Sequence, residues 1–164
     1  MNEQDGTLMN EFDSGQIYVN AEGDWFYQGN RIIREDILEF FYDHLTVGEK
    51  HSYAIVWKDQ RCALEVDDTP FVVSRVDRRC VEGQMGEQFV LSLKHLSRSE
   101  VLDPGTLRVG DHNVLYARVR SGRFLARFSR PAYYQLAAWI NEDAESGEFY
   151  LDVNGERHPV LVQA

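Results

Sequence analysis

The run Val66-Asp67-Asp68-Thr69-Pro70-Phe71 constrains the fold more than any other stretch, because similar apolar patterns lie on either side of it. Proline has no backbone N–H and fixes φ, so it does not fit inside a central strand. One strand therefore stops before the two aspartates, and another starts after the proline. The sequence predicts three segments: a flexible polar tail over residues 1–16, an N-terminal subdomain over 17–69 and a C-terminal subdomain over 70–164.

Composition narrows the class of protein. The chain has 164 residues, of which 43% are hydrophobic, so it can bury a core. Its formal charge is -10, which argues against binding polymeric nucleic acid, since phosphate backbones are recognised by basic faces. No run approaches the roughly 20 apolar residues of a membrane-spanning helix. With only two cysteines, Cys62 and Cys80, the chain is predicted to be reduced, cytoplasmic and without a membrane partner.

Local patterns predict an α+β fold with mainly antiparallel sheets. Asp36 and Glu39 match a capping box, and an apolar stripe at helical spacing follows, which predicts a helix over residues 35–46. A second helix is predicted to begin after Ser129 as N-cap, with Pro131 in its first turn and an apolar stripe that reaches Ile140. Hairpins are predicted over 25–33, 53–66, 114–128 and 149–162, and further strands over 17–19, 71–76, 89–93 and 107–109.

The pattern occurs twice. Residues 34–66 and 130–162 share one order of elements: an arginine, an amphipathic helix, a short break and a hairpin. The register holds without gaps, because residue 130 follows residue 34 by 96 positions, as 162 follows 66. The sequence therefore predicts a duplicated hairpin-helix-hairpin unit.

Three motifs resemble a bacterial family, the one catalogued as domain of unknown function 1285. They are residues 25–34 (WFYQGNRIIR), residues 66–71 (VDDTPF) and residues 127–136 (RFSRPAYYQL). The resemblance implies a duplicated α+β core, a C-terminal half loosely like pleckstrin-homology folds, and a ligand site between the halves. It also implies a nucleotide-like ligand and a signalling role, and it brings no established activity.

Arg34 and Arg130 each stand at a predicted helix start, where the helix dipole already supplies partial positive charge. An anion is expected near each of them. One interpretation is a structural ion pair with Asp67 or Asp68 that ties the halves together. The other is a phosphate or carboxylate ligand, held by helix amides and arginine forks, with the aspartates binding hydroxyl groups.

Arginines also gather in the predicted hairpin before the second helix, where Arg127 is the last of four before Arg130. A solvated sheet face and an anion-binding face are both compatible with this pattern. Tyr134 could stack on a planar ring or belong to the core. No metal-ligand spacing or catalytic motif occurs, so no cofactor and no enzymatic activity are predicted, although a hydrolase built on Asp68 with His112 or His158 stays open.

The sequence thus predicts a non-enzymatic protein that binds a small anionic or nucleotide-like ligand between two repeated subdomains. The predicted site residues are Arg34, Asp67, Asp68, Arg127, Arg130 and Tyr134. The alternative is a protein-interaction module in which hairpin edges pair with a partner and the arginine and aspartate residues are purely structural.

Overall fold

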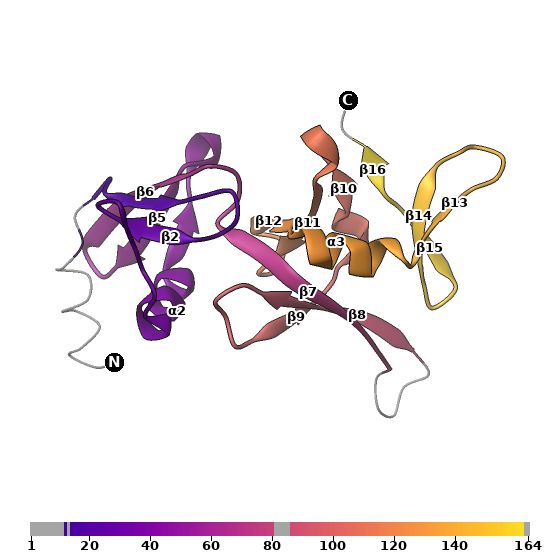
Figure 1. The fold of residues 1–164 in the computed structure, drawn as a ribbon, viewed down its shortest axis with the longest axis horizontal. Coiled ribbons are helices and arrows are strands. Elements are labelled where there is room, and N and C mark those ends of the chain that lie inside the picture. Colours follow the sequence, from indigo (N-terminus) through magenta and orange to yellow (C-terminus); the bar gives the residue numbers. More distant parts are fainter. Residues whose placement is uncertain (1–11, 13, 81–85, 163–164) are drawn as a thin grey trace. The chain divides into compact units, whose positions relative to one another are not determined.

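The computed structural model describes residues 12, 14–80 and 86–162, so most of the predicted tail over residues 1–16 lies outside the described residues. The chain divides into two compact units, unit 1 (Met1–Pro70) and unit 2 (Phe71–Ala164). Strands predominate in both, and the described residues form two α-helices, which confirms the α+β class (Figure 1). Neither of these helices is long and apolar enough to cross a membrane.

Unit 1 contains a six-stranded mixed sheet. The turn residues Gln28 and Gly29, with φ of 48° and 81°, join its second and third strands as the predicted hairpin. Its first strand pairs parallel with the sixth, and the other neighbours are antiparallel. In the order β3-β2-β1-β6-β5-β4, the strands are β1 (Ile17–Val19), β2 (Trp25–Tyr27), β3 (Asn30–Arg31), β4 (Leu45–Val47), β5 (Tyr53–Trp57) and β6 (Gln60–Val66).

Helix α2 (Glu35–Asp43) is shorter than predicted. The prediction that it continues to residue 46 was wrong, because Leu45 begins β4 and pairs with Ile55 of β5. The capping-box prediction was wrong as well. Arg34 occupies the N-cap position without a side-chain cap, and Asp36 lies inside the first turn. The amphipathic pattern still identified the buried face, which consists of Ile37, Leu38, Phe40, Phe41 and Tyr42.

Aromatic side chains join α2 to the sheet of unit 1. Trp25 and Phe41 are fully buried and stack with ring centroids 5.6 Å apart. The Trp25 indole N–H donates to the Tyr42 hydroxyl over 2.9 Å, and that hydroxyl donates to the Pro70 carbonyl over 2.7 Å. The junction at the end of unit 1 is therefore tied to the core by a buried hydrogen-bond chain, which gives both polar groups a partner.

Unit 2 contains a seven-stranded mixed sheet. Most of its neighbouring strands pair antiparallel, as predicted, but two pairs are parallel, with Val73 opposite Phe128 and Val109 opposite Val162. The first strand is also longer than predicted, since its pairing extends to Cys80 opposite Glu87. In the order β16-β10-β11-β12-β7-β8-β9, the strands are β7 (Phe71–Cys80), β8 (Glu87–Leu93), β9 (Ser99–Val101), β10 (Arg108–Val109), β11 (Leu115–Val119), β12 (Phe124–Phe128) and β16 (Leu161–Val162).

Helix α3 (Arg130–Ala137) packs on β7 and β12 through buried Ala132 and Leu136. The predicted cap is confirmed, because the Ser129 hydroxyl accepts the Ala132 N–H over 3.3 Å. The predicted extension of the stripe to Ile140 was wrong, since Ile140 pairs with Leu151 in a separate three-stranded antiparallel sheet. That sheet consists of β13 (Ile140–Glu142), β14 (Phe149–Val153) and β15 (Glu156–Pro159).

Three short 3-10 helices complete the described secondary structure: η1 (Glu49–His51), η2 (Pro104–Thr106) and η3 (Asp111–Asn113).

Candidate functional site

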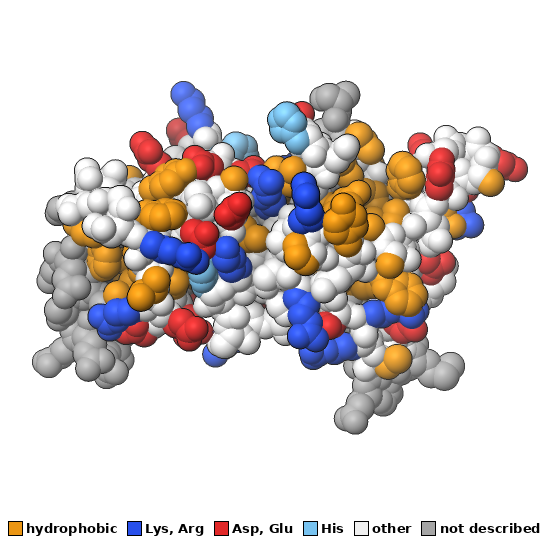
Figure 2. All heavy atoms as spheres, viewed as in Figure 1, with side chains coloured by type: hydrophobic (Ala, Val, Ile, Leu, Met, Phe, Trp, Pro, Cys, Tyr) orange, Lys and Arg blue, Asp and Glu red, His pale blue; other side chains and the backbone are white. Residues whose placement is uncertain are grey.

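A cavity of about 450 Å³ lies in unit 2, where η3, β12 and the first turn of α3 meet. Basic and apolar side chains, the latter including tyrosine, adjoin on the surface over the region of β12 and α3 (Figure 2). No acidic side chain occurs among the described residues that line the cavity, so their charged groups are positive. The lining residues are His112, Asn113, Val114, Leu115, Arg127, Phe128, Arg130, Tyr133 and Tyr134.

Arg130 is the first residue of α3 and is exposed at this cavity. Within the described part of the chain, no carboxylate lies within ion-pair distance of its guanidinium, and the first turn of α3 contains no acidic residue. The partial positive charge of a helix start adds to the charge of this arginine. An anion at this place would therefore lower the electrostatic energy of the unit.

Arg127 reaches the cavity from β12, two residues before the cap of the helix. Its backbone is fixed on both sides, opposite Tyr116 of β11 and Val72 of β7. The side chain is half-buried. A rigid central strand and a helix start thus present two guanidinium groups to one cavity, which is the donor arrangement that suits phosphate or carboxylate oxygens.

Aromatic rings form another part of the lining. Tyr133 and Tyr134 lie with ring centroids 5.4 Å apart in an edge-to-face arrangement, and Tyr134 is 64% exposed. Phe128, the last residue of β12, is buried and also lines the cavity. The exposure of Tyr134 rules out the core interpretation for this residue and leaves its ring available to a planar ligand group.

The predicted residues of unit 1 have different surroundings. The Arg34 guanidinium binds the Asp36 carboxylate through two hydrogen bonds of 3.1 and 2.6 Å, and this contact lowers the pKa of Asp36. Asp67 accepts a short hydrogen bond from the Tyr18 hydroxyl, which raises the pKa of Tyr18. Asp68 is half-buried.

Of the six predicted site residues, the structure brings three together, since Arg127, Arg130 and Tyr134 line the same cavity. Arg34, Asp67 and Asp68 belong to unit 1. Their convergence with Arg130 stays a prediction. The arginines of the preceding hairpin, Arg118, Arg120 and Arg123, are not among the described lining residues.

His112 was predicted only as a residue of the hydrolase alternative, and Asn113 was not predicted at all. Both line the cavity from left-handed backbone, with φ of 59° and 60°. Histidine and asparagine are enriched in that region, so the run Gly110-Asp111-His112-Asn113 was a readable turn signal. The connection from β4 to β5 in unit 1 has the same geometry: Lys50 and His51 have φ of 55° and 56°, and both connections begin with an extended glycine.

Among residues 12, 14–80 and 86–162, no group of three or more His, Cys, Asp or Glu side chains could hold a metal ion.

Fold and cavity together define a class of protein: an α+β chain of two units with mixed sheets, whose second unit presents arginine and tyrosine side chains to a cavity at a helix start. No protein-family model and no curated protein matches the chain.

Two crystal structures share this fold. One is a DUF1285 family protein from Silicibacter pomeroyi DSS-3, with a TM-score of 0.72 and 23% identity over 91% of this chain and 81% of that one. Another is a DUF1285 family protein from Shewanella baltica OS155, with a TM-score of 0.64 and 18% identity over 77% of this chain and 94% of that one. The predicted resemblance to domain of unknown function 1285 is thereby confirmed at the level of the fold. The likeness brings no activity to this chain.

Proposed function

We propose that unit 2 binds a small anionic ligand in the cavity at the start of α3. The single observation that carries this proposal is Arg130, a helix-leading arginine that lines the cavity and has no carboxylate partner in the described part of the chain. A charge left without a counter-charge beside a helix start favours an anion from solution. Phosphate and carboxylate groups both match the planar donor pattern of a guanidinium.

The guanidinium groups, rather than helix amides, would make the main contacts to the anion. Pro131 has no N–H, and the Ala132 N–H is already used by the Ser129 cap. Arg130 and Arg127 therefore have the two principal donor roles. This division of roles distinguishes the site from a phosphate loop, in which successive backbone amides surround the anion.

We propose further that the ligand carries a planar ring, as a nucleotide does. A volume of about 450 Å³ falls within the roughly 300–1,000 Å³ of small-molecule sites. The exposed ring of Tyr134 offers a stacking surface next to the arginines. Since no carboxylate occurs among the described lining residues, we propose binding without catalysis, in a cytoplasmic, ligand-sensing protein.

We also infer that the two halves share an ancestral unit. Strands β5 and β14 each have five residues and start 96 positions apart, at Tyr53 and Phe149. Each forms a two-residue hairpin in the same register, with Ile55 opposite Cys62 and Leu151 opposite His158. These matches support the duplication. The loose likeness of the C-terminal half to pleckstrin-homology folds remains part of the proposal.

A second candidate function is supported by the edge of the seven-stranded sheet. Strand β16 is an edge strand of this sheet, and its side chains Leu161 and Val162 are 60% and 67% exposed. An edge strand with exposed apolar side chains can accept an added strand from a protein partner. This alternative assigns no ligand to the cavity.

A melting screen separates the two candidates. Inorganic phosphate, nucleotides and sugar phosphates are added to the full chain, and the melting temperature is recorded. A ligand at 100 times its dissociation constant stabilises a protein by about 2.7 kcal/mol, which is readily measured. We expect at least one phosphorylated compound to raise the melting temperature, and a ring-bearing compound to raise it more than phosphate does.

The matched variants are Arg130→Ala and Arg34→Ala, each of which removes an exposed arginine at the start of a helix. The first should abolish the ligand-induced shift, and the second should retain it. If no compound changes the melting temperature, or if Arg130→Ala responds like the unaltered protein, the ligand-binding proposal is wrong. A partner protein that co-purifies with the unaltered chain, but not with a variant in which Leu161 is replaced by a charged residue, would then favour the interaction module.

A further inference from the structure

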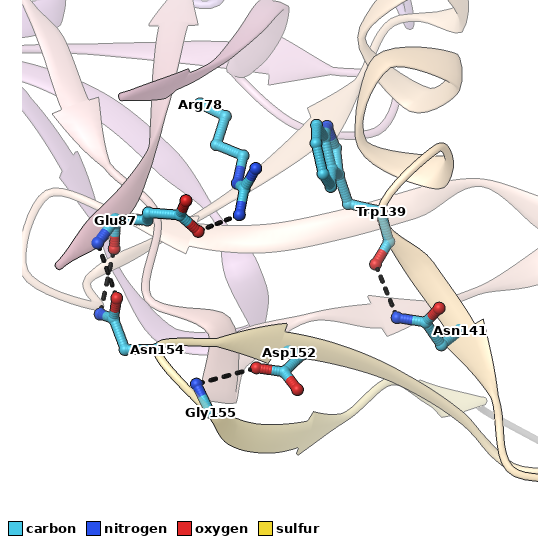
Figure 3. Close-up of polar contacts among 7 residues, drawn as sticks. All are labelled: Arg78, Glu87, Trp139, Asn141, Asp152, Asn154 and Gly155. Atoms are coloured by element: carbon cyan, nitrogen blue, oxygen red, sulfur yellow. Dashed lines mark hydrogen bonds and ion pairs between the residues drawn. The ribbon is translucent and has the colours of Figure 1, made fainter. Parts of the chain in front are cut away.

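A side-chain amide joins the two sheets of unit 2. The turn between β14 and β15 contains Asn154 and Gly155, both in left-handed backbone with φ of 55° and 80°. The Asn154 carbonyl oxygen accepts the backbone N–H of Glu87 over 2.6 Å, and its amide nitrogen donates to the Glu87 carbonyl over 3.1 Å (Figure 3). The asparagine thus bonds to β8 as a neighbouring strand would, with one donor and one acceptor.

Glu87 also takes part in a second set of contacts, which runs through Arg78 to Trp139. Its carboxylate forms an ion pair with Arg78 of β7, and the Arg78 guanidinium lies 4.1 Å from the centroid of the Trp139 ring, just before β13 (Figure 3). Such a stacked cation and ring attract each other electrostatically. Glu87 therefore bonds to the three-stranded sheet through its backbone, and its side chain pairs with the arginine that stacks on Trp139, the residue before that sheet.

The residues of this turn also carry a reactive sequence. Asn154-Gly155 is the single Asn-Gly dipeptide in the chain. Glycine has no side chain to obstruct its own nitrogen, and a Cβ placed at Gly155 would meet nothing within 4 Å. The nitrogen of residue 155 and the amide carbon of residue 154 are separated by few bonds, so a five-membered ring can form without any partner molecule.

We propose that Asn154 is a protected deamidation site, whose conversion releases the three-stranded sheet from β8. In this reaction the Gly155 nitrogen bonds to the Asn154 side-chain carbon. The bond from that carbon to the amide nitrogen breaks, and the nitrogen leaves as ammonia with the proton of Gly155. Water then opens the cyclic imide and yields aspartate or isoaspartate at position 154.

The folded protein protects this site because the reacting groups are held by hydrogen bonds. Both polar atoms of the Asn154 amide are bound to Glu87, and the Gly155 N–H donates to the Asp152 carboxylate over 2.9 Å. Ring closure requires the amide to rotate away from these partners. The rate should therefore follow the fraction of molecules in which the contact with Glu87 is open.

Conversion changes what the side chain can do at the junction. A carboxylate has no donor for the Glu87 carbonyl, and its second oxygen would face that carbonyl oxygen. Isoaspartate adds a carbon to the main chain inside a two-residue turn whose left-handed geometry is fixed by the hairpin register, with Val153 opposite Glu156. Either product weakens the contact with β8, and the change does not reverse.

The test is conversion of the full-length chain on incubation at mildly alkaline pH, measured by peptide mass and by an isoaspartate assay. The two hydrogen bonds between the Asn154 side chain and the Glu87 backbone must open before the ring can close. Conversion at Asn154 should therefore be on the order of tenfold or more slower in the folded protein than in urea. Arg78→Ala, which removes the ion pair to Glu87 and the contact with Trp139, should accelerate conversion in the folded protein. Arg75→Ala is the matched control, because Arg75 lies on the same strand and pairs with Asp77.

A second variant measures the consequence independently of the rate. Asn154→Asp should increase hydrogen exchange along the first residues of β8 relative to the unaltered protein. Equal conversion rates in the folded and unfolded chain, equal effects of Arg78→Ala and Arg75→Ala, or unchanged exchange in Asn154→Asp would each overturn the proposal.

Discussion

The starts of α2 and α3 each include an arginine, Arg34 at the N-cap of α2 and Arg130 as the first residue of α3, but give it different partners. Arg34 binds Asp36 in the first turn of its own helix, where Glu35 adds a second negative charge. Arg130 has a first turn without acidic residues, a serine cap and a cavity beside it. The first arrangement neutralises the cation within the helix. The second leaves it for a ligand, which is why unit 2 and not unit 1 contains the candidate site.

The two units also differ in net charge, and unit 1 is the acidic one. Residues 1–70 contain 5 Lys and Arg against 15 Asp and Glu, a net charge of 5 minus 15, or -10. Residues 71–164 contain 12 of each, and 12 minus 12 is zero. The whole acidic excess therefore belongs to unit 1. The total charge of the chain therefore understates how favourable unit 2 alone is for binding an anion.

The largest expected difference between the two helices concerns packing. Phe41 of α2 is fully buried against Trp25, so Phe41→Ala should lower the free energy of unfolding by about 3–5 kcal/mol. Tyr134 of α3 is 64% exposed, so Tyr134→Ala should change it by less than about 0.5 kcal/mol. Urea unfolding measures both values, and similar losses for the two variants would show that Tyr134 has a structural role.

The two similar connections, η1 and η3, should respond differently to a methyl group. A Cβ at Gly110 would lie 2.9 Å from a ring carbon of Tyr116, whereas a Cβ at Gly48 would lie 3.0 Å from the mobile hydroxyl of Ser52. Gly110→Ala should therefore destabilise the protein by about 1–3 kcal/mol. Gly48→Ala should cost less, because the Ser52 side chain can rotate. A larger loss for Gly48→Ala in thermal unfolding would contradict this difference.

The helix caps predict a smaller contrast. The Ser129 side chain caps α3, so Ser129→Ala should reduce the free energy of unfolding by about 1 kcal/mol. Arg34 provides no side-chain cap, and Arg34→Ala removes only an exposed ion pair, so its effect on the free energy of unfolding should be smaller than that of Ser129→Ala. Denaturant titration of both variants measures the two losses of stability, and a larger loss for Arg34→Ala would contradict this contrast between the caps.

The smallest effects concern two aspartates with lowered pKa values. Arg34 is the main cause at Asp36, so Arg34→Ala should bring the Asp36 pKa back toward its ordinary value of 3.8. At Asp143 the backbone N–H groups of Ser146 and Glu145 come first, and Arg157→Ala should leave that pKa low. NMR titration of the carboxyl groups distinguishes the two, and an equal rise in both variants would refute the assignment.

The sign of the linked stability follows from these pKa values. Both are lower in the folded state than in the unfolded chain, so each carboxylate stabilises the fold above pH 3.8 and loses this effect as the pH falls through its folded-state pKa.

Much of the fold could be predicted from the sequence, because local signals decided it. The proline junction at residue 70 and the Asn154-Gly155 turn occupy the expected places between strands. What failed depends on contacts distant in sequence. Leu45 fits the apolar stripe of α2, yet pairing with Ile55 places it in a strand. Parallel pairing, as between Ile17 and Leu64, leaves no local signal either.

The candidate site was predicted in part for a similar reason. Arg130 was predicted because it stands at a helix start, where the dipole adds partial positive charge, and Tyr134 because an aromatic ring can stack on a planar group. His112 and Asn113 reach the cavity through the folding of the sheet, on a connection between β10 and β11. No turn was predicted for that connection, and only tertiary structure could place it beside α3.

An NMR titration of the arginine side-chain N–H signals with inorganic phosphate tests most directly whether the two helix starts differ in anion binding. If Arg130 is the cation left for a ligand, its signal should shift along a saturating curve, while the signal of Arg34, already bound to Asp36, should follow ionic strength alone. Saturable binding at Arg34, or equal and linear shifts at both arginines, would contradict the distinction between the two helix starts.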